Sequence, residues 1–134
     1  MKEHHHEKLS LIQDMIALSQ ADGHVSFMED HFILSIATKL GVSAQELQQL
    51  KENPVSFNPQ EVEMDRITHF YRLLLLMGVD DEHHEEEIEF CKNTGLKMGL
   101  RPAAINEVID RLLESENGML PPDEIIRIFQ AHHN

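Results

Sequence analysis

Apolar residues recur every three or four positions along almost the whole chain, which is the period of an amphipathic α-helix. No segment alternates apolar and polar residues as a half-buried strand does. The sequence therefore predicts an all-α fold. Two series show the period most clearly: Met28, Phe32, Ile33, Ile36, Ala37, Leu40 and Met64, Ile67, Tyr71, Leu74, Leu75.

Capping residues, glycines and prolines divide this pattern into helices. A serine followed three residues later by glutamate, the signature of a capping box, occurs at Ser26 and again at Ser43. Asn58 before Pro59 indicates a third helix start. Seven helices are predicted, at about residues 5–21, 27–40, 44–52, 59–77, 82–98, 102–115 and 122–132.

Two of these helices have informative surfaces. Residues 73–77 are apolar on every side, so the helix at 59–77 is predicted to be the buried centre, with Leu74 and Leu75 in the core. The helix at 82–98 carries its apolar and small residues on one stripe, which is typical of a surface helix packed on the central helix. Thr94 and Gly95 on this stripe predict a close approach of neighbouring helices.

The sequence matches itself at an offset of 58 residues, both in identities and in apolar positions. A duplicated three-helix unit explains this match most simply. We therefore predict one domain over residues 1–134, a compact bundle of two pseudo-repeats at about 8–52 and 66–115 followed by the helix at 122–132. The identical pairs are Asp22 and Asp80, Glu29 and Glu87, Phe32 and Phe90, Lys39 and Lys97, and Gly41 and Gly99.

The charge balance narrows the range of partners and compartments. Lys and Arg number 11 against 24 Asp and Glu, a formal net charge of −13 that repels nucleic acid and anionic membranes. No apolar stretch approaches the ~20 residues of a membrane-spanning helix, so membrane insertion is not expected. The single cysteine, Cys91, cannot form an intramolecular disulfide, and the first residues do not resemble a signal peptide. These features predict a cytoplasmic protein.

A short acidic turn precedes the second predicted helix. It reads Ala21-Asp22-Gly23, with Glu29 soon after, and the helix that follows ends in Lys39-Leu40-Gly41. This pattern resembles the TerB-like family of tellurite-resistance proteins, and a degenerate second copy contains Asp80 and Glu87. The resemblance covers almost the whole chain. It implies an all-α bundle of two halves, a cytoplasmic stress-response role and divalent-metal binding through the acidic positions.

The acidic turns allow two interpretations. In the first, the halves pack about a pseudo-twofold axis and Asp22, Glu29, Asp80 and Glu87 converge on a divalent cation, with Mg²⁺ or Ca²⁺ favoured over Zn²⁺ because all the ligands are oxygens. In the second, Glu29 completes a capping box with Ser26, and the acids from 80 to 87 complement a helix dipole. The sequence leaves both open.

The histidines and the cysteine favour neither a transition-metal site nor catalysis. His83 and His84 are adjacent and so point to different faces of a helix. The one Glu-x-x-His motif, Glu3 to His6, lies in the N-terminal tail, which argues against a di-iron bundle. His69 is expected to be hydrogen-bonded or exposed, and Cys91 to act as a small buried hydrophobe. No catalytic motif is present, so the protein is not predicted to be an enzyme.

Three functions follow, in order of preference. The first is a TerB-like stress-response scaffold that binds a divalent cation and acts through protein partners. The second is an adaptor without metal whose acidic helix, residues 80–89, binds a basic protein partner. The third is a metal-dependent hydrolase that uses the same carboxylates.

Overall fold

The computed structural model describes residues 2–21, 27–59, 61–78, 85–116 and 118–133, with side chains from His5 onward. Within these ranges the chain forms seven α-helices and no strand, which confirms the predicted all-α fold. The described helices agree with the predicted ones to within four residues at every end. They are α1 (Lys2–Gln20), α2 (Phe27–Lys39), α3 (Ala44–Glu52), α4 (Glu63–Met77), α5 (Glu85–Lys97), α6 (Pro102–Glu114) and α7 (Pro122–Ala131).

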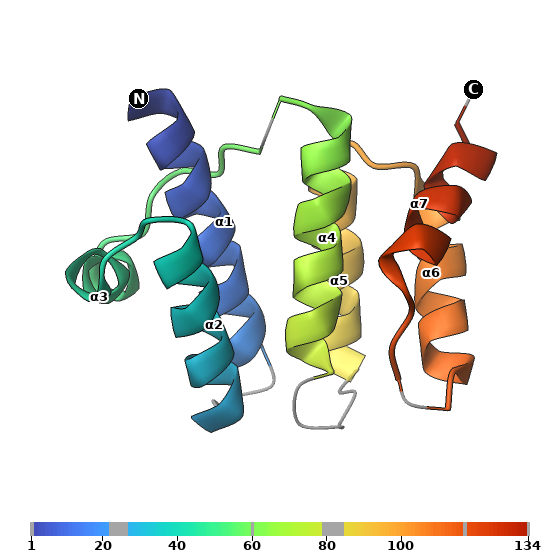
Figure 1. Ribbon diagram of the computed structural model, residues 1–134, viewed down its shortest axis with the longest axis horizontal. Coiled ribbons are helices and arrows are strands. Elements are labelled where there is room, and N and C mark those ends of the chain that lie inside the picture. The colour runs from blue at the N-terminus through green and yellow to red at the C-terminus, as the bar shows by residue number, and fades with distance from the viewer. Residues whose placement is uncertain (1, 22–26, 60, 79–84, 117, 134) are drawn as a thin grey trace.

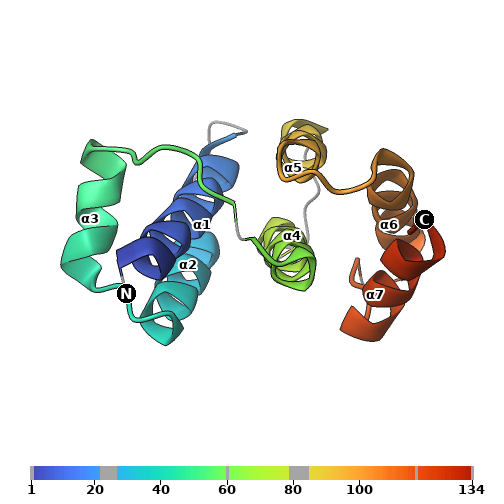
Figure 2. The ribbon, with the colours of Figure 1, turned by 90° about the horizontal axis from the view of Figure 1, so that it is seen from above.

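The helices form a bundle around a central pair, α1 and α4 (Figure 1). Helix α2 packs mainly on α1 and α5 packs mainly on α4, on opposite sides of the pair when the molecule is viewed along the helices (Figure 2). At one side α3 covers α1 and α2, and at the other α6 and α7 cover α5 and α4. Among the described helices, none has both the length and the apolar character that crossing a membrane requires.

The predicted helix starts are partly right. Ser43 forms the expected capping box at α3: its Oγ accepts a hydrogen bond from the Glu46 amide at 3.1 Å, and Glu46 Oε1 accepts one from the Ser43 amide at 3.2 Å. Asn58 does not cap α4, which begins later, at Glu63. Instead the Asn58 amide donates to Ser10 Oγ at 2.9 Å and ties the preceding loop to α1. Ser26 lies outside the described residues.

Helix α4 is the buried centre, as predicted. Leu73, Leu74, Leu76 and Met77 are each 3% exposed or less. Leu75 is only half-buried, so the prediction that it belongs to the core is wrong. Successive helical residues point about 100° apart, and Leu75 lies on the side of α4 that its neighbouring helices leave partly open.

The predicted close approach at Gly95 is confirmed. A Cβ atom at this position would lie 2.8 Å from Ile105 Cδ1 on α6 and 3.3 Å from Phe70 Cε1 on α4. Since real Cβ contacts are rarely that short, α5 packs against both helices more closely than a larger residue would allow. This contact fixes the position of α6 beside α5.

Local structure in the two halves follows the 58-residue offset. Helices α2 and α5 have equivalent first and last residues, and each is followed by a glycine in the left-handed region, Gly41 at φ 81° and Gly99 at φ 82°. The amide after each glycine donates to the equivalent carbonyl, at 2.8 Å from Val42 and 3.0 Å from Leu100. These matches are what two pseudo-repeats would produce; the duplication and the single-domain boundary stay predictions.

Candidate functional site

Two of the four predicted ligands, Glu29 and Glu87, are described, and both are buried. Glu29 lies in the first turn of α2 and is 4% exposed, and Glu87 lies in the first turn of α5 and is 2% exposed. Their acidic neighbours Asp30, Glu85 and Glu86 are exposed. Burial therefore distinguishes the two glutamates from the other acids at these helix starts.

The fold brings the starts of α2 and α5 to the same end of the molecule (Figure 1). Glu29 and Glu87 lie in the first turns of these helices, so both are near that end of the bundle. Asp22 and Asp80 lie outside the described residues, so their predicted convergence with the glutamates stays a prediction. Within the described part of the chain, no three histidine, cysteine or acidic residues are grouped to hold a metal ion.

A comparison with Glu46 shows what the burial means. Glu46 completes the capping box of α3, and its side chain remains 34% exposed at the surface. Glu29 and Glu87 are nearly inaccessible, so they differ from Glu46 in exposure. The capping box of Glu29 with Ser26 stays a prediction, because Ser26 lies outside the described residues. A buried carboxylate loses its hydration and must be compensated by hydrogen bonds, by the positive end of a helix dipole or by a cation. Both glutamates have interactions within the chain, and both lie at helix starts, where the dipole favours negative charge.

Cys91 lies one turn after Glu87 on α5 and is completely buried. Burial, together with the nearby Glu87 charge, raises the pKa of the Cys91 thiol far above its ordinary value. The thiol therefore stays protonated at physiological pH, and a protonated buried thiol is neither a nucleophile nor a metal ligand. This agrees with the prediction that Cys91 acts as a small buried hydrophobe.

A partly buried polar pair that the sequence did not predict joins the central helices. His69 on α4 is 2% exposed, and its Nε2 donates to Asp14 Oδ2 on α1 at 3.0 Å. His69 was expected to be hydrogen-bonded or exposed, but its partner, 55 residues away, was not identified. The repeat could have indicated that His69 is buried, because at an offset of 58 residues His69 corresponds to Leu11, which is a core residue.

The other described histidines make surface contacts. His5 pairs with Glu46 at 2.5 Å, His132 with Glu107 at 2.7 Å and His133 with Glu63 at 3.6 Å. Each pair joins residues that are far apart in the sequence and does not form part of a metal cluster among the described residues. His31 is exposed and stacks on Phe27, His6 accepts from Asn58, and His24, His83 and His84 lie outside the described residues.

The fold and site together define a class: a compact all-α bundle in which two helices begin with a buried glutamate at the same end. Residues 1–52 match the model of the family described as Tellurite resistance protein TerB. This part of the chain is therefore similar to TerB, as its acidic turn predicted, and the matched segment spans α1 to α3 and contains Glu29. No curated protein and no solved structure matches the chain.

Proposed function

We propose that this TerB-like protein binds a divalent cation, Mg²⁺ or Ca²⁺, at the end of the bundle where α2 and α5 begin, and serves as a non-enzymatic scaffold in a cytoplasmic stress response. The burial of Glu29 and Glu87, at 4% and 2% exposure, carries the proposal. Asp22 and Asp80 complete the proposed ligand set.

The chemistry of these residues suits a hard cation. Two carboxylates inside one end of a protein repel one another, and a divalent cation between them offsets that repulsion and their lost hydration. Oxygen ligands favour Mg²⁺ or Ca²⁺, whereas Zn²⁺ sites are usually built from cysteine and histidine. The one cysteine is a buried, protonated thiol, which further favours the hard cations.

The two alternatives are supported to different degrees. An adaptor without metal is supported by the exposed acids Glu85, Glu86 and Glu89 on α5, which a basic partner would complement. A hydrolase needs an open metal position beside a base in a concave pocket. Glu29 and Glu87 are buried, which suits a closed structural site better than an open catalytic one.

The test is to titrate chelator-treated protein with Mg²⁺ or Ca²⁺. Binding is measured by calorimetry, and stabilisation is measured by thermal melting. A ligand that binds only the folded state stabilises it by about 2.7 kcal/mol at a free concentration of about 100 Kd. We expect Mg²⁺ or Ca²⁺ to stabilise the parent, and Glu29→Gln, Glu87→Gln, Asp22→Asn and Asp80→Asn each to remove that stabilisation. Only titrations with Mg²⁺ and Ca²⁺ test the proposed site, because His4, His5 and His6 would bind transition metals by themselves.

Glu46→Gln is the matched control. It makes the same change in a glutamate at a helix start, but at one whose carboxylate caps α3 on the surface. This variant should respond to the cation as the parent does. If the four proposed ligand variants also respond as the parent does, these residues are not ligands, and the adaptor without metal becomes the better explanation.

A further inference from the structure

A groove of about 390 Å³ lies between α5 and α6, and Glu29 and Glu87 are not among the residues that line it. Ile88 and Ile105 form its apolar floor, and Leu96, 48% exposed, lies along one wall. Glu85 and Glu89 contribute acidic groups to the same groove. It therefore combines an apolar floor with a negatively charged edge.

The close packing of α5 on α6 shapes this groove. Ile105 is 1% exposed and lies against Gly95, where a Cβ atom would be only 2.8 Å from Ile105 Cδ1. Since packed interiors deform little, the floor is held by the core beneath it. The groove is thus formed before any partner binds, which lowers the cost of binding.

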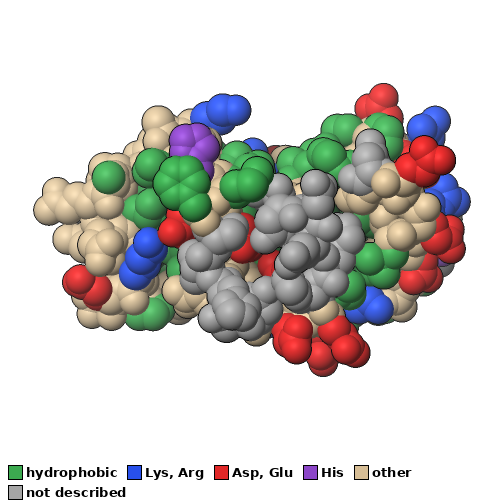
Figure 3. All heavy atoms as spheres, turned by 90° about the horizontal axis from the view of Figure 1, so that it is seen from below, with side chains coloured by type: hydrophobic (Ala, Val, Ile, Leu, Met, Phe, Trp, Pro, Cys, Tyr) green, Lys and Arg blue, Asp and Glu red, His purple; other side chains and the backbone are tan. Residues whose placement is uncertain are grey.

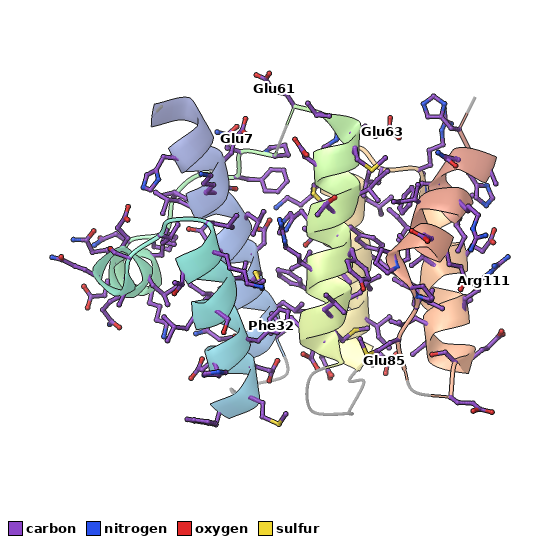
Figure 4. All side chains as sticks on the ribbon, viewed as in Figure 1. Glu7, Phe32, Glu61, Glu63, Glu85 and Arg111 are labelled. Atoms are coloured by element: carbon purple, nitrogen blue, oxygen red, sulfur yellow. The ribbon has the colours of Figure 1, made fainter. Side chains whose placement is uncertain are left out.

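Most of the charged side chains in and beside the groove are acidic. Glu85, Glu86 and Glu89 are exposed on α5. Glu85 lies at the start of this helix (Figure 4), and acidic side chains gather on this end of the molecule (Figure 3). Lys92 is the single basic residue that lines the groove among the described residues. A ligand that presents positive charge around an apolar centre would complement both features.

We propose that the groove between α5 and α6 binds a basic amphipathic helix of a protein partner. The apolar side chains of that helix pack on Leu96 and Ile88, and its Lys or Arg side chains pair with Glu85 and Glu89. This is the helix-in-groove mode of recognition, in which residues at i, i+3, i+4 and i+7 are the anchors.

Charge also argues against other occupants. A second copy of this chain would bring a further net charge of −13 toward the groove. Nucleic acid and anionic lipid surfaces are repelled for the same reason. A basic protein segment is the macromolecule that the field attracts.

The probe is a synthetic helical peptide of about five turns, with leucines at i, i+3, i+4 and i+7 and lysines elsewhere. A scrambled peptide of identical composition tests whether the helical pattern matters. Binding is measured by fluorescence anisotropy at ~0.15 M salt, where surface electrostatics are partly screened. Amide NMR shifts locate the contact. The measurements are made both in chelator and in Mg²⁺, because the inference does not depend on the proposed cation site.

Two pairs of matched variants test the groove. Leu96→Glu should weaken binding about tenfold or more, because it puts a charge on the apolar wall, whereas Leu113→Glu, at 46% exposure on α6 outside the groove, should leave affinity unchanged. Glu85→Lys with Glu89→Lys should also weaken binding about tenfold. Glu114→Lys with Glu116→Lys makes the same net charge change elsewhere and should have a much smaller effect.

Three results would overturn the proposal. The first is equal binding of the scrambled peptide, and the second is equal loss of affinity in the two charge variants, since either would show diffuse electrostatic attraction. The third is a set of NMR shifts centred away from α5 and α6. If Leu96→Glu changes the circular dichroism of the protein, Leu96→Ala replaces it, with Leu113→Ala as its control. If the parent protein binds the peptide but is not stabilised by Mg²⁺ or Ca²⁺ in the earlier titrations, the proposed cation site is refuted and this inference stands.

Discussion

The two halves of the molecule, α1 to α3 and α4 to α6, resemble one another inside and differ outside. Many pairs of residues related by the 58-residue offset are buried in both halves. At the surface, α2 begins with exposed apolar residues, Phe27 at 85% and Met28 at 54%, whereas α5 begins with the exposed acids Glu85 and Glu86. The shared interior specifies the bundle, and the different surfaces give each half its own interactions. Buried equivalents include Ile12 and Phe70, Glu29 and Glu87, Ala37 and Gly95, and Leu47 and Ile105.

The halves also differ in what covers them. In the first half the loop after α3 is tied to α1, where Gln13 Nε2 donates to the Val55 carbonyl at 2.6 Å. In the second half α7 does the covering, and Phe129 packs edge-on against Phe70 with ring centroids 6.0 Å apart. The first 52 residues, which match TerB, end at the last residue of α3, so this loop and α7 both lie beyond the matched segment.

The largest expected effects test whether the two interiors are one core. Ile16 and Leu74 are equivalent and are 7% and 3% exposed. Ile16→Ala and Leu74→Ala should each lower the free energy of unfolding by about 2–5 kcal/mol, through lost transfer energy and a residual cavity. Both should do so in a single cooperative transition in a urea titration. Leu113→Ala, at an exposed site, is the control. A cost under about 1 kcal/mol for Leu74→Ala would contradict the central position of α4.

The second prediction concerns a place where the interiors differ. His69 occupies the position that Leu11 has in the first half, and it donates to Asp14 across the central pair. His69→Leu leaves the Asp14 carboxylate without this donor and should cost about 1–3 kcal/mol.

Removing both partners distinguishes the pair from general packing. Adding Asp14→Ala to His69→Leu should cost less than the two single changes together, because no carboxylate is then left without its donor. We expect a coupling free energy of about 1 kcal/mol or more from the four chemical denaturation curves. Additive effects would show that the hydrogen bond contributes nothing beyond packing.

The third prediction replaces one residue of the second half by the residue found at the equivalent position of the first half. The position of Gly95 is occupied by Ala37 in α2, so Gly95→Ala makes the second half resemble the first. The new Cβ would meet Ile105 Cδ1 at 2.8 Å, and we expect overpacking to outweigh the gain in helix propensity, with a net cost of about 1 kcal/mol.

Ile105→Val removes the Cδ1 atom in question and should relieve the strain. In the Ile105→Val background, Gly95→Ala should therefore be neutral or stabilising, as measured by thermal unfolding. If Gly95→Ala is equally costly in both backgrounds, the contact with Ile105 is not what requires glycine at this position.

Most of the fold could be predicted because the signals are local. Helical period, the capping box at Ser43, and glycines at the ends of α2 and α5 act within a few residues, and the described helices follow them closely. The start of α4 was missed because Asn58 bonds to Ser10 on α1, 48 residues earlier. A tertiary hydrogen bond has no local signature in the sequence.

The candidate site was predictable in part. The offset of 58 residues identified Glu29 and Glu87 as equivalent, but not their burial, since acids at a helix start are usually solvated caps. The partner of His69 and the groove beside Leu96 depend on how helices pack, which periodicity does not specify. These are the features for which the structure was needed.

The smallest expected effect compares how each half holds its third helix. His5 on α1 bonds to Glu46 on α3, and His132, just after α7, bonds to Glu107 on α6. The hydrogen bond from His132 lowers the pKa of Glu107 below its ordinary value of 4.5, and the bond from His5 does the same for Glu46. A carboxyl whose pKa is lower in the folded state stabilises the fold above its unfolded pKa, and that stabilisation is lost as pH falls through the folded value.

Carboxyl-carbon NMR titration of the native protein measures the two groups separately, and each histidine variant is the control for the other. His132→Ala should raise the pKa of Glu107 toward 4.5 and leave Glu46 unchanged, while His5→Ala should do the reverse. Because both glutamates are at the surface, the loss of stability in each histidine variant should be small. It should be present above about pH 5 and disappear as the pH falls through the folded pKa of the glutamate. A change at Glu46 in His132→Ala would mean that the two contacts are coupled through the bundle, and the halves would then not hold their third helices independently.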